Sequence, residues 1–128
     1  MVDHIPQAIV AVVDDDPGVL ESIESVLASA GYDVRVFKSA MALLASKDFA
    51  EIACLISDIG MPVINGYELQ RIVHNIRPEM AVIFITGDPD WQIGEQSEIP
   101  HCGMFHKPFD CEGLLTAVEN ALLRPSHR

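Results

Sequence analysis

Short runs of apolar residues, each ending in a charged or turn-forming residue, recur along this chain. We interpret five of them as β-strands, at 8–13, 32–37, 52–57, 81–86 and 103–106. Four are nearly continuous in apolar residues, which is typical of strands buried on both faces of a parallel sheet. The run at 32–37 alternates between polar and apolar residues, so we expect it to be an edge strand that is more exposed than the others.

Helical patterns lie between these runs. Helices are expected to start at four residues of types that favour N-caps, namely Asp16, Ser39, Asn65 and Asp110. In the third helix, Leu69, Ile72, Val73 and Ile76 form an apolar stripe at helical spacing. Strands that alternate with helices predict an α/β domain with a parallel sheet and right-handed crossovers.

The segment at 88–101 breaks this alternation. It contains Pro89, Gly94 and Pro100 and has no apolar stripe. We therefore expect the helix before the last strand to be short or irregular, with one or two turns at most, and we expect the segment to be mobile. Trp91, within it, either covers the core or is an exposed contact for a partner.

Length and charge restrict the function classes. A chain of 128 residues is enough for one domain, whose core we place at about 7–123, with 124–128 as a tail. Its 49% hydrophobic and 21% charged residues are typical of a folded globular protein. The formal charge of -11 disfavours direct binding to nucleic acid or to an anionic membrane surface, and it favours metal cations and basic partner surfaces.

The cysteines and the apolar runs predict a cytoplasmic protein. Cys54, Cys102 and Cys111 lack the spacing of a metal site, and we expect them to be reduced thiols. No apolar run approaches the roughly 18 residues of a membrane span. The first residues also lack the pattern of a signal peptide.

Polar side chains gather where the predicted strands end. Asp14 and Asp15 follow the first strand, Asp58 follows the third, Thr86 ends the fourth and Lys107 follows the fifth. The carboxyl ends of parallel strands meet at one edge of a sheet. Two carboxylates about 4 Å apart repel by about 4 kcal/mol at an effective dielectric constant near 20, so a cluster of three requires a cation, shared protons or full solvation. With oxygen ligands only, Mg²⁺ is the favoured ion.

This set of groups is suited to phosphoryl transfer. Lys107 is a point charge suited to a phosphate or a carboxylate, and Thr86 offers a short hydroxyl donor. Asp58 is the best candidate nucleophile, because it follows the central strand and carboxylates can form acyl phosphates. The structural alternative is a buried cluster of ion pairs, but groups from four strand ends favour a functional site.

Four motifs resemble those of the receiver domains of two-component response regulators. They are the segments 12–17 (VVDDDP), 56–62 (ISDIGMP), 84–87 (FITG) and 105–109 (FHKPF). Their order and spacing match over essentially the whole chain. The resemblance implies a flavodoxin-like (βα)5 three-layer sandwich with strand order 2-1-3-4-5.

The resemblance also implies roles for the residues at the sheet edge. Asp58 would accept a phosphoryl group from the phosphohistidine of a histidine kinase. Mg²⁺ would be bound by Asp15, Asp58 and the carbonyl of Gly60, with Asp14 helping directly or through water. Thr86 and Lys107 would contact the phosphoryl oxygens, and the bond between Lys107 and Pro108 would be cis.

The implied protein is a signalling phosphoacceptor rather than an enzyme in the ordinary sense. Its only chemistry would be self-catalysed phosphotransfer and autodephosphorylation. The expected partners are a histidine kinase or phosphotransfer protein, and an output domain or downstream protein that reads the changed surface. A homodimer is left open.

Three departures from the family pattern keep alternatives open. Met104 stands where the family has its switch aromatic, and strand alternation directs the neighbouring Phe105 to the other face. Gly60 stands where many members have a larger side chain that influences the attacking water. The segment between Thr86 and Lys107 is one residue shorter than usual. The alternative to a phosphorylated receiver is a pseudo-receiver, a binding module that acts without phosphorylation. A nucleotide-binding enzyme is disfavoured, because acidic residues replace a glycine-rich loop after the first strand.

Overall fold

The computed structural model describes residues 8–87 and 103–123. Its five strands are β1 (Ile9–Val13), β2 (Asp33–Phe37), β3 (Ile52–Asp58), β4 (Ala81–Thr86) and β5 (Gly103–His106). All neighbouring strands are parallel, in the order β2-β1-β3-β4-β5. This is the predicted flavodoxin-like order, and it places β2 at an edge as expected.

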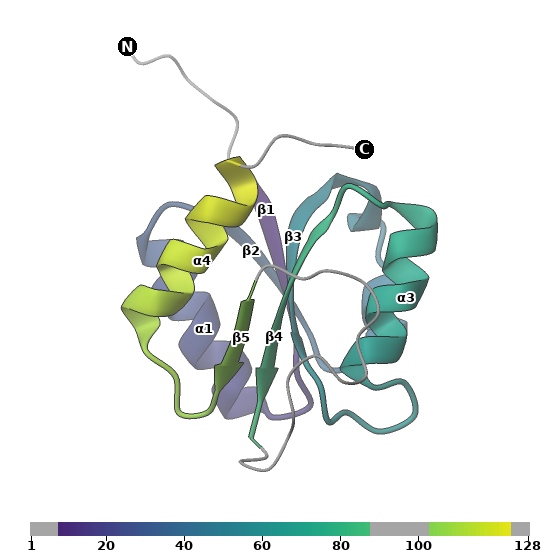
Figure 1. The fold of residues 1–128 in the computed structure, drawn as a ribbon, viewed down its shortest axis with the longest axis horizontal. Coiled ribbons are helices and arrows are strands. Elements are labelled where there is room, and N and C mark those ends of the chain that lie inside the picture. The colour runs from purple at the N-terminus through teal and green to yellow at the C-terminus, as the bar shows by residue number, and fades with distance from the viewer. Residues whose placement is uncertain (1–7, 88–102, 124–128) are drawn as a thin grey trace.

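Helices lie on both faces of the sheet (Figure 1). They are α1 (Pro17–Ser29), α2 (Ala40–Leu44), α3 (Gly66–Ile76) and α4 (Cys111–Leu123), with a short 3-10 helix at Phe49–Glu51. One apolar cluster joins the sheet to α2 and α3, and a second joins it to α1 and α4. These helices and the sheet form the predicted three-layer sandwich, in which side chains alternate along each strand between the two clusters.

The helices α1, α2 and α3 start directly after the N-cap residues that we expected. Asp16 accepts a hydrogen bond from the Gly18 N–H at 2.9 Å, and Ser39 accepts one from Ala42 at 3.1 Å. Before α3, the Asn65 side chain accepts from the Glu68 N–H and the Glu68 carboxylate accepts from the Asn65 N–H, both at 2.9 Å. These reciprocal bonds form a capping box, which fixes where the helix begins.

Several details differ from the sequence prediction. β1 and β2 each begin one residue later than expected. β3 runs one residue further than expected, so Asp58 is the last residue of the strand rather than the first of the loop. In α3, Leu69 and Val73 are buried as predicted, whereas Ile76 is 57% exposed. Ile76 is the last residue of the helix, and Arg77 follows it as the C-cap with non-helical backbone angles.

Several predictions fall outside the described residues. These are the short or irregular helix and the mobility at 88–101, the role of Trp91, and the tail at 124–128. Of the cysteines that the structure describes, Cys54 is buried and Cys111 is exposed, and neither forms a disulfide. Within residues 8–87 and 103–123, no helix is long and apolar enough to cross a membrane.

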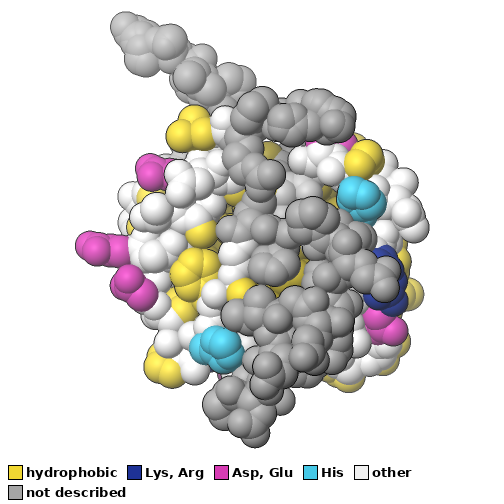
Figure 2. Space-filling model, viewed as in Figure 1, with side chains coloured by type: hydrophobic (Ala, Val, Ile, Leu, Met, Phe, Trp, Pro, Cys, Tyr) yellow, Lys and Arg dark blue, Asp and Glu magenta, His cyan; other side chains and the backbone are white. Residues whose placement is uncertain are grey.

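The charged side chains are unevenly placed on the face that Figure 2 shows. Acidic side chains lie over α4, and both basic and acidic side chains lie on the α3 side. The first turn of α4 carries the exposed Glu112, and Glu119 is exposed further along the same helix. The excess of acidic residues in the chain is therefore visible on the α4 side of the molecule.

Candidate functional site

Three carboxylates meet at the carboxyl edge of the sheet, as predicted. Asp14 and Asp15 follow β1, and Asp58 ends the neighbouring strand β3. One oxygen atom from each lies within 4.8 Å of the others. Such a cluster of oxygen atoms is suited to a hard divalent cation.

The three carboxylates differ in exposure. Asp14 is fully buried, Asp58 is 6% exposed and Asp15 is exposed to solvent. A cation held by them would therefore contact buried charge on one side and keep water ligands on the other, which is the arrangement that Mg²⁺ prefers.

Lys107 lies next to this cluster at the end of β5. Its Nζ is 2.9 Å from Asp14 Oδ2 and 3.8 Å from Asp58 Oδ1. Burial lowers the pKa of the Lys107 ammonium, but the carboxylates of Asp14 and Asp58 outweigh it, so the net shift is upward. The ammonium is therefore charged at neutral pH and is shared between two carboxylates.

Asp14 depends on this ammonium. Its Oδ1 accepts a hydrogen bond from the Asp16 N–H at 2.9 Å. Its Oδ2 is buried and accepts no well-aligned hydrogen bond among the described residues, so the ion pair with Lys107 balances its charge. A buried, charged carboxylate oxygen is stabilised when a cation binds to it.

Asp58 has a raised pKa. Burial is the main cause, the neighbouring Asp14 carboxylate adds to it, and Lys107 and the Gly60 N–H oppose it. The contact from the Gly60 N–H to Asp58 Oδ1 is long, at 3.4 Å. In the protein without a cation, the cluster therefore holds more negative charge than its surroundings stabilise.

Thr86 and Gly60 lie at the same edge. Thr86 is 2% exposed and ends β4, and its carbonyl accepts a hydrogen bond from the Lys107 N–H at 2.8 Å. Gly60 is exposed in the loop after β3, and a Cβ atom added there would meet no atom within 4 Å. The bond between Lys107 and Pro108 is cis, as the resemblance implied.

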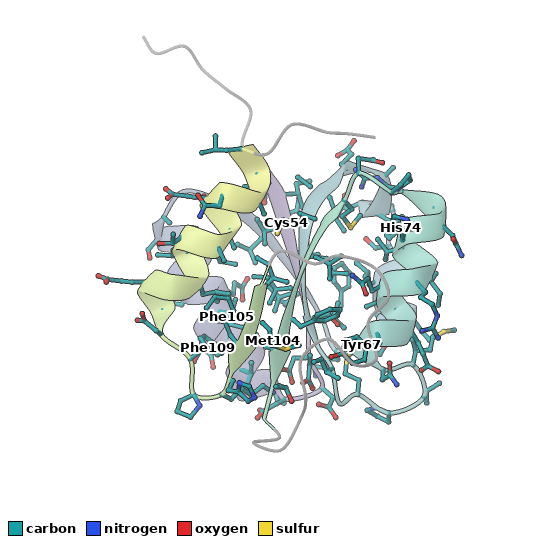
Figure 3. The ribbon with its side chains drawn as sticks, viewed as in Figure 1. Cys54, Tyr67, His74, Met104, Phe105 and Phe109 are labelled. Carbon is teal, nitrogen blue, oxygen red and sulfur yellow. The ribbon has the colours of Figure 1, made fainter. Side chains whose placement is uncertain are left out.

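Met104 occupies the position that we identified for the switch. It is half-buried and packs against the cluster on the α3 face, whereas Phe105 packs on the α4 face (Figure 3). The same cluster holds Tyr67 and Phe84, whose rings meet edge to face with centroids 4.9 Å apart. The opposite directions of Met104 and Phe105 confirm the alternation predicted for β5.

Two residues of the loop and helix after β3 were not singled out by sequence reasoning. Gly66 is buried at the start of α3. Val63 is 90% exposed and has a φ of 72°, which is unusual for a β-branched residue. The signal for Gly66 was present in the sequence: glycine is a poor helix former, so a glycine directly after an N-cap suggests a close approach.

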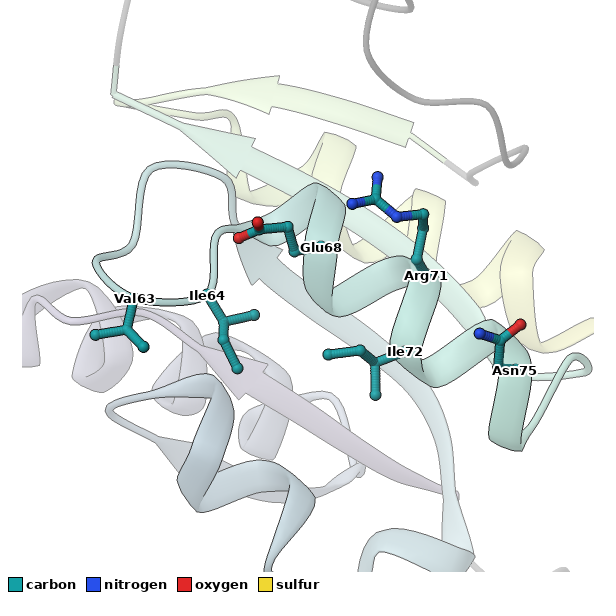
Figure 4. Close-up of a pocket in the computed structure, with 6 residues that line it drawn as sticks. All are labelled: Val63, Ile64, Glu68, Arg71, Ile72 and Asn75. Atoms are coloured by element: carbon teal, nitrogen blue, oxygen red, sulfur yellow. The ribbon is translucent and has the colours of Figure 1, made fainter.

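An open groove lies beside the same helix. It is lined by Val63 and Ile64 from the loop and by Glu68, Arg71, Ile72 and Asn75 from α3 (Figure 4). The groove contains none of the residues that gather at the sheet edge. The candidate functional site is therefore the acidic cluster of Asp14, Asp15 and Asp58 rather than this groove.

Sequence comparison identifies the family of this chain and several relatives. The family described as "Response regulator receiver domain" matches residues 10–119. "Response regulator protein TmoT" of Ectopseudomonas mendocina is 34% identical over 117 residues, which are 91% of this chain and 53% of that protein. "Transcriptional regulatory protein FixJ" of Azorhizobium caulinodans is 33% identical over 93% of this chain and 57% of its own length. The chain therefore spans little more than half the length of these relatives.

Solved structures give the same result. Response regulator StyR superimposes with a TM-score of 0.83 at 32% identity, over 91% of this chain and 59% of that one. The receiver domain of DrrB, in a structure described as activated by BeF3, gives a TM-score of 0.82 at 29% identity, over 92% of this chain and 99% of that one. The fold match therefore includes a chain of which nearly the whole length is one receiver domain.

Proposed function

The chain belongs to the response regulator receiver domain family, and from this premise we propose that Asp58 accepts the phosphoryl group that passes the signal. It is a receiver domain of two-component response regulators, a signalling protein rather than an ordinary enzyme. The observation that carries the proposal is the approach of Asp14, Asp15 and Asp58 to within 4.8 Å of one another, with the Lys107 ammonium 3.8 Å from Asp58.

The acidic cluster fits Mg²⁺. Its donors are all oxygen atoms, and one of them, Asp14 Oδ2, is buried and, among residues 8–87 and 103–123, forms an ion pair only with the Lys107 ammonium. In our proposal Asp15, Asp58 and the Gly60 carbonyl hold the ion, with Asp14 bound directly or through water. When bound, Mg²⁺ would neutralise carboxylate charge and the charge that develops on the phosphoryl oxygens.

Side chains of the protein would then carry out the transfer of the phosphoryl group. An Asp58 carboxylate oxygen attacks the phosphorus of a phosphohistidine, the P–N bond breaks, and an acyl phosphate forms on Asp58. Lys107 and the Thr86 hydroxyl contact the phosphoryl oxygens and stabilise their charge. Transfer in from the donor and later hydrolysis of the acyl phosphate both occur at this site, and both are self-catalysed in our proposal.

The proposed partners follow from this chemistry. A histidine kinase or a phosphotransfer protein supplies the phosphoryl group, and an output domain or a downstream protein responds to the changed surface. Phosphorylation adds roughly two negative charges at one point, which requires an element with two states to transmit it. We place the switch at Met104, whose flexible side chain can fill the space that Thr86 would leave on moving toward the phosphoryl group.

The alternative, a pseudo-receiver that binds partners without phosphorylation, is not favoured. Such a module has no need for three carboxylates, a buried hydroxyl residue and a lysine at one edge. The mutual repulsion of the carboxylates is a cost to stability that phosphoryl transfer would explain. Met104 alone does not outweigh that arrangement.

The test is phosphorylation by a small donor. Wild type, Asp58→Asn and the surface control Glu119→Gln are incubated with acetyl phosphate, with Mg²⁺ or with EDTA, and their intact masses are measured. We expect wild type and Glu119→Gln to gain one phosphate only when Mg²⁺ is present, and Asp58→Asn to gain none. No gain in wild type would favour the pseudo-receiver, and a gain in Asp58→Asn would move the acceptor to another residue.

A further inference from the structure

Gly66 lies against the backbone that carries the phosphoacceptor. A Cβ atom added to Gly66 would be 2.7 Å from the carbonyl oxygen of Asp58 and 2.8 Å from the Cα of Ile59. These are backbone atoms, which cannot turn aside as the end of a side chain can. By contrast, a Cβ on Gly103 or Gly113 would meet side chains, at 3.2 and 3.4 Å. The first turn of α3 can therefore reach the end of β3 only because residue 66 has no side chain.

Backbone hydrogen bonds also join the start of α3 to the end of β3. The Gly66 N–H donates to the carbonyl of Ile59 at 2.9 Å, and the Ile59 N–H donates to the carbonyl of Ile85 in β4, also at 2.9 Å. The start of α3 is thus tied through Ile59 to the neighbouring strand. The capping box of Asn65 and Glu68 pairs the N–H groups of the first turn, whereas the contact with the end of β3 is made by Gly66.

We propose that Gly66 is a positioning residue for the phosphoryl-transfer site. By letting α3 close on the Asp58 backbone, it sets where the Asp58 carboxylate and the Gly60 carbonyl lie relative to Asp14 and Asp15. Those two aspartates come from β1, so their distance from Asp58 depends on how the end of β3 is held. This inference rests on the proposed function, because positioning matters only if the cluster binds Mg²⁺ and transfers a phosphoryl group.

The expected effect of Gly66→Ala follows from the short distance between the added Cβ atom and the Asp58 backbone. A methyl group at 2.7 Å from an oxygen must move away by several tenths of an ångström, and either α3 or the end of β3 has to shift. Reactive groups need placement within about 0.5 Å, and a shift of about 1 Å can reduce a rate about 100-fold. We expect the dissociation constant for Mg²⁺ to rise about 10-fold or more, and the rate of phosphorylation by acetyl phosphate at saturating Mg²⁺ to fall as well.

Two control variants separate positioning from stability. Asn65→Ala removes the cap and destabilises α3 by about 1 kcal/mol, but it leaves the space beside Asp58 unchanged. Gly113→Ala adds a methyl group in α4, where contacts are ordinary. We expect both to retain the wild-type Mg²⁺ affinity, measured by calorimetry with MgCl₂. If Asn65→Ala and Gly66→Ala lose affinity in proportion to their loss of stability, Gly66 has only a structural role and the inference is wrong.

A measurement on wild type covers the case in which Gly66→Ala does not fold. Because the Gly66 N–H is bonded to Ile59, we expect Mg²⁺ to slow hydrogen exchange at the Gly66 amide and to leave the Gly113 amide unchanged. Equal exchange at Gly66 with and without Mg²⁺ would overturn the inference. If wild type itself binds no Mg²⁺ and takes up no phosphate, the proposed function fails. If wild type does both and folded Gly66→Ala does both equally well, only the positioning role fails.

Discussion

The Lys107 ammonium is closer to Asp14 than to Asp58: its Nζ lies 2.9 Å from the Asp14 carboxylate and 3.8 Å from the Asp58 carboxylate. The lysine thus balances the most buried charge of the cluster while it stays close to the proposed phosphoacceptor. When a phosphoryl group adds charge at Asp58, only a small movement would bring the ammonium to it. One residue therefore stabilises the unphosphorylated domain and is in reach of the transferred group.

Lys107→Met should destabilise the protein in the absence of divalent cations. The substitution leaves the buried Asp14 carboxylate without its counter-charge, and we expect a loss of about 1–3 kcal/mol in the free energy of unfolding. Added Mg²⁺ should recover part of this loss, because it would supply positive charge to the same cluster. Urea unfolding in EDTA and in Mg²⁺ measures both effects. Lys47→Met, at an exposed lysine, is the control and should change the stability by less than about 0.5 kcal/mol.

Asp58→Asn should stabilise the metal-free protein at neutral pH. Burial and the Asp14 carboxylate hold the pKa of Asp58 above its ordinary value of 3.8, so the folded protein binds this proton more tightly than the unfolded chain. The favourable contribution of Asp58 is full below pH 3.8 and is lost as the pH rises through the folded-state pKa. The gain in Tm from Asp58→Asn in EDTA should therefore be largest near pH 7 and should shrink as the pH falls toward 4. A gain that does not change with pH would contradict this origin.

Mg²⁺ should raise the Tm of wild type, because an ion that binds only the folded state stabilises it. Asp15→Asn should blunt this increase, since Asp15 is one of the three carboxylates of the cluster. Glu119→Gln, which removes an exposed carboxylate from α4, is the matched control and should keep the full increase. Thermal scans over a range of Mg²⁺ concentrations compare the three proteins. Equal increases in both variants would remove Asp15 from the metal site.

Much of the fold was predictable because its signals are local. Apolar strand runs, the caps at Asp16 and Ser39, and the capping box at Asn65 depend only on residues close in sequence. The gathering of Asp14 and Asp58 followed from the rule that parallel strands present their carboxyl ends at one edge. Local patterns and sheet geometry together therefore predicted that these carboxylates lie close to one another.

The finer geometry was not predictable because it depends on contacts between distant segments. The preference of Lys107 for Asp14 over Asp58 depends on how the side chain from β5 reaches across the intervening strands. The close approach of Gly66 to the Asp58 backbone arises where α3 meets the end of β3, and a glycine after an N-cap gives no measure of that distance. Val63 was missed for another reason: its φ of 72° is opposed to the preference of its own side chain.

Gly60 should influence how long the phosphorylated state lasts. A side chain at residue 60 would extend into open space, and the residue's N–H is 3.4 Å from Asp58 Oδ1, so the side chain would stand close to the acyl phosphate. We expect Gly60→Met to slow hydrolysis several-fold by limiting the access of water. The decay of the phosphorylated mass after removal of the donor measures this rate, with Gly60→Ala as the smaller control. Decay of Gly60→Met at the wild-type rate would show that residue 60 does not control the attacking water.

Val63→Gly should stabilise the domain. Val63 is 90% exposed, so its removal loses little buried apolar surface, whereas its φ of 72° places a β-branched side chain in the left-handed region. That conformation costs roughly 1–2 kcal/mol for a residue with a Cβ, and glycine adopts it freely. Because glycine also gives the unfolded chain more freedom, we expect a net gain of about 1 kcal/mol in the free energy of unfolding, measured with urea. Val63→Ala keeps a Cβ atom and should gain less. If Val63→Gly is no more stable than wild type, strain at this residue does not limit the stability of the loop that joins Asp58 to α3.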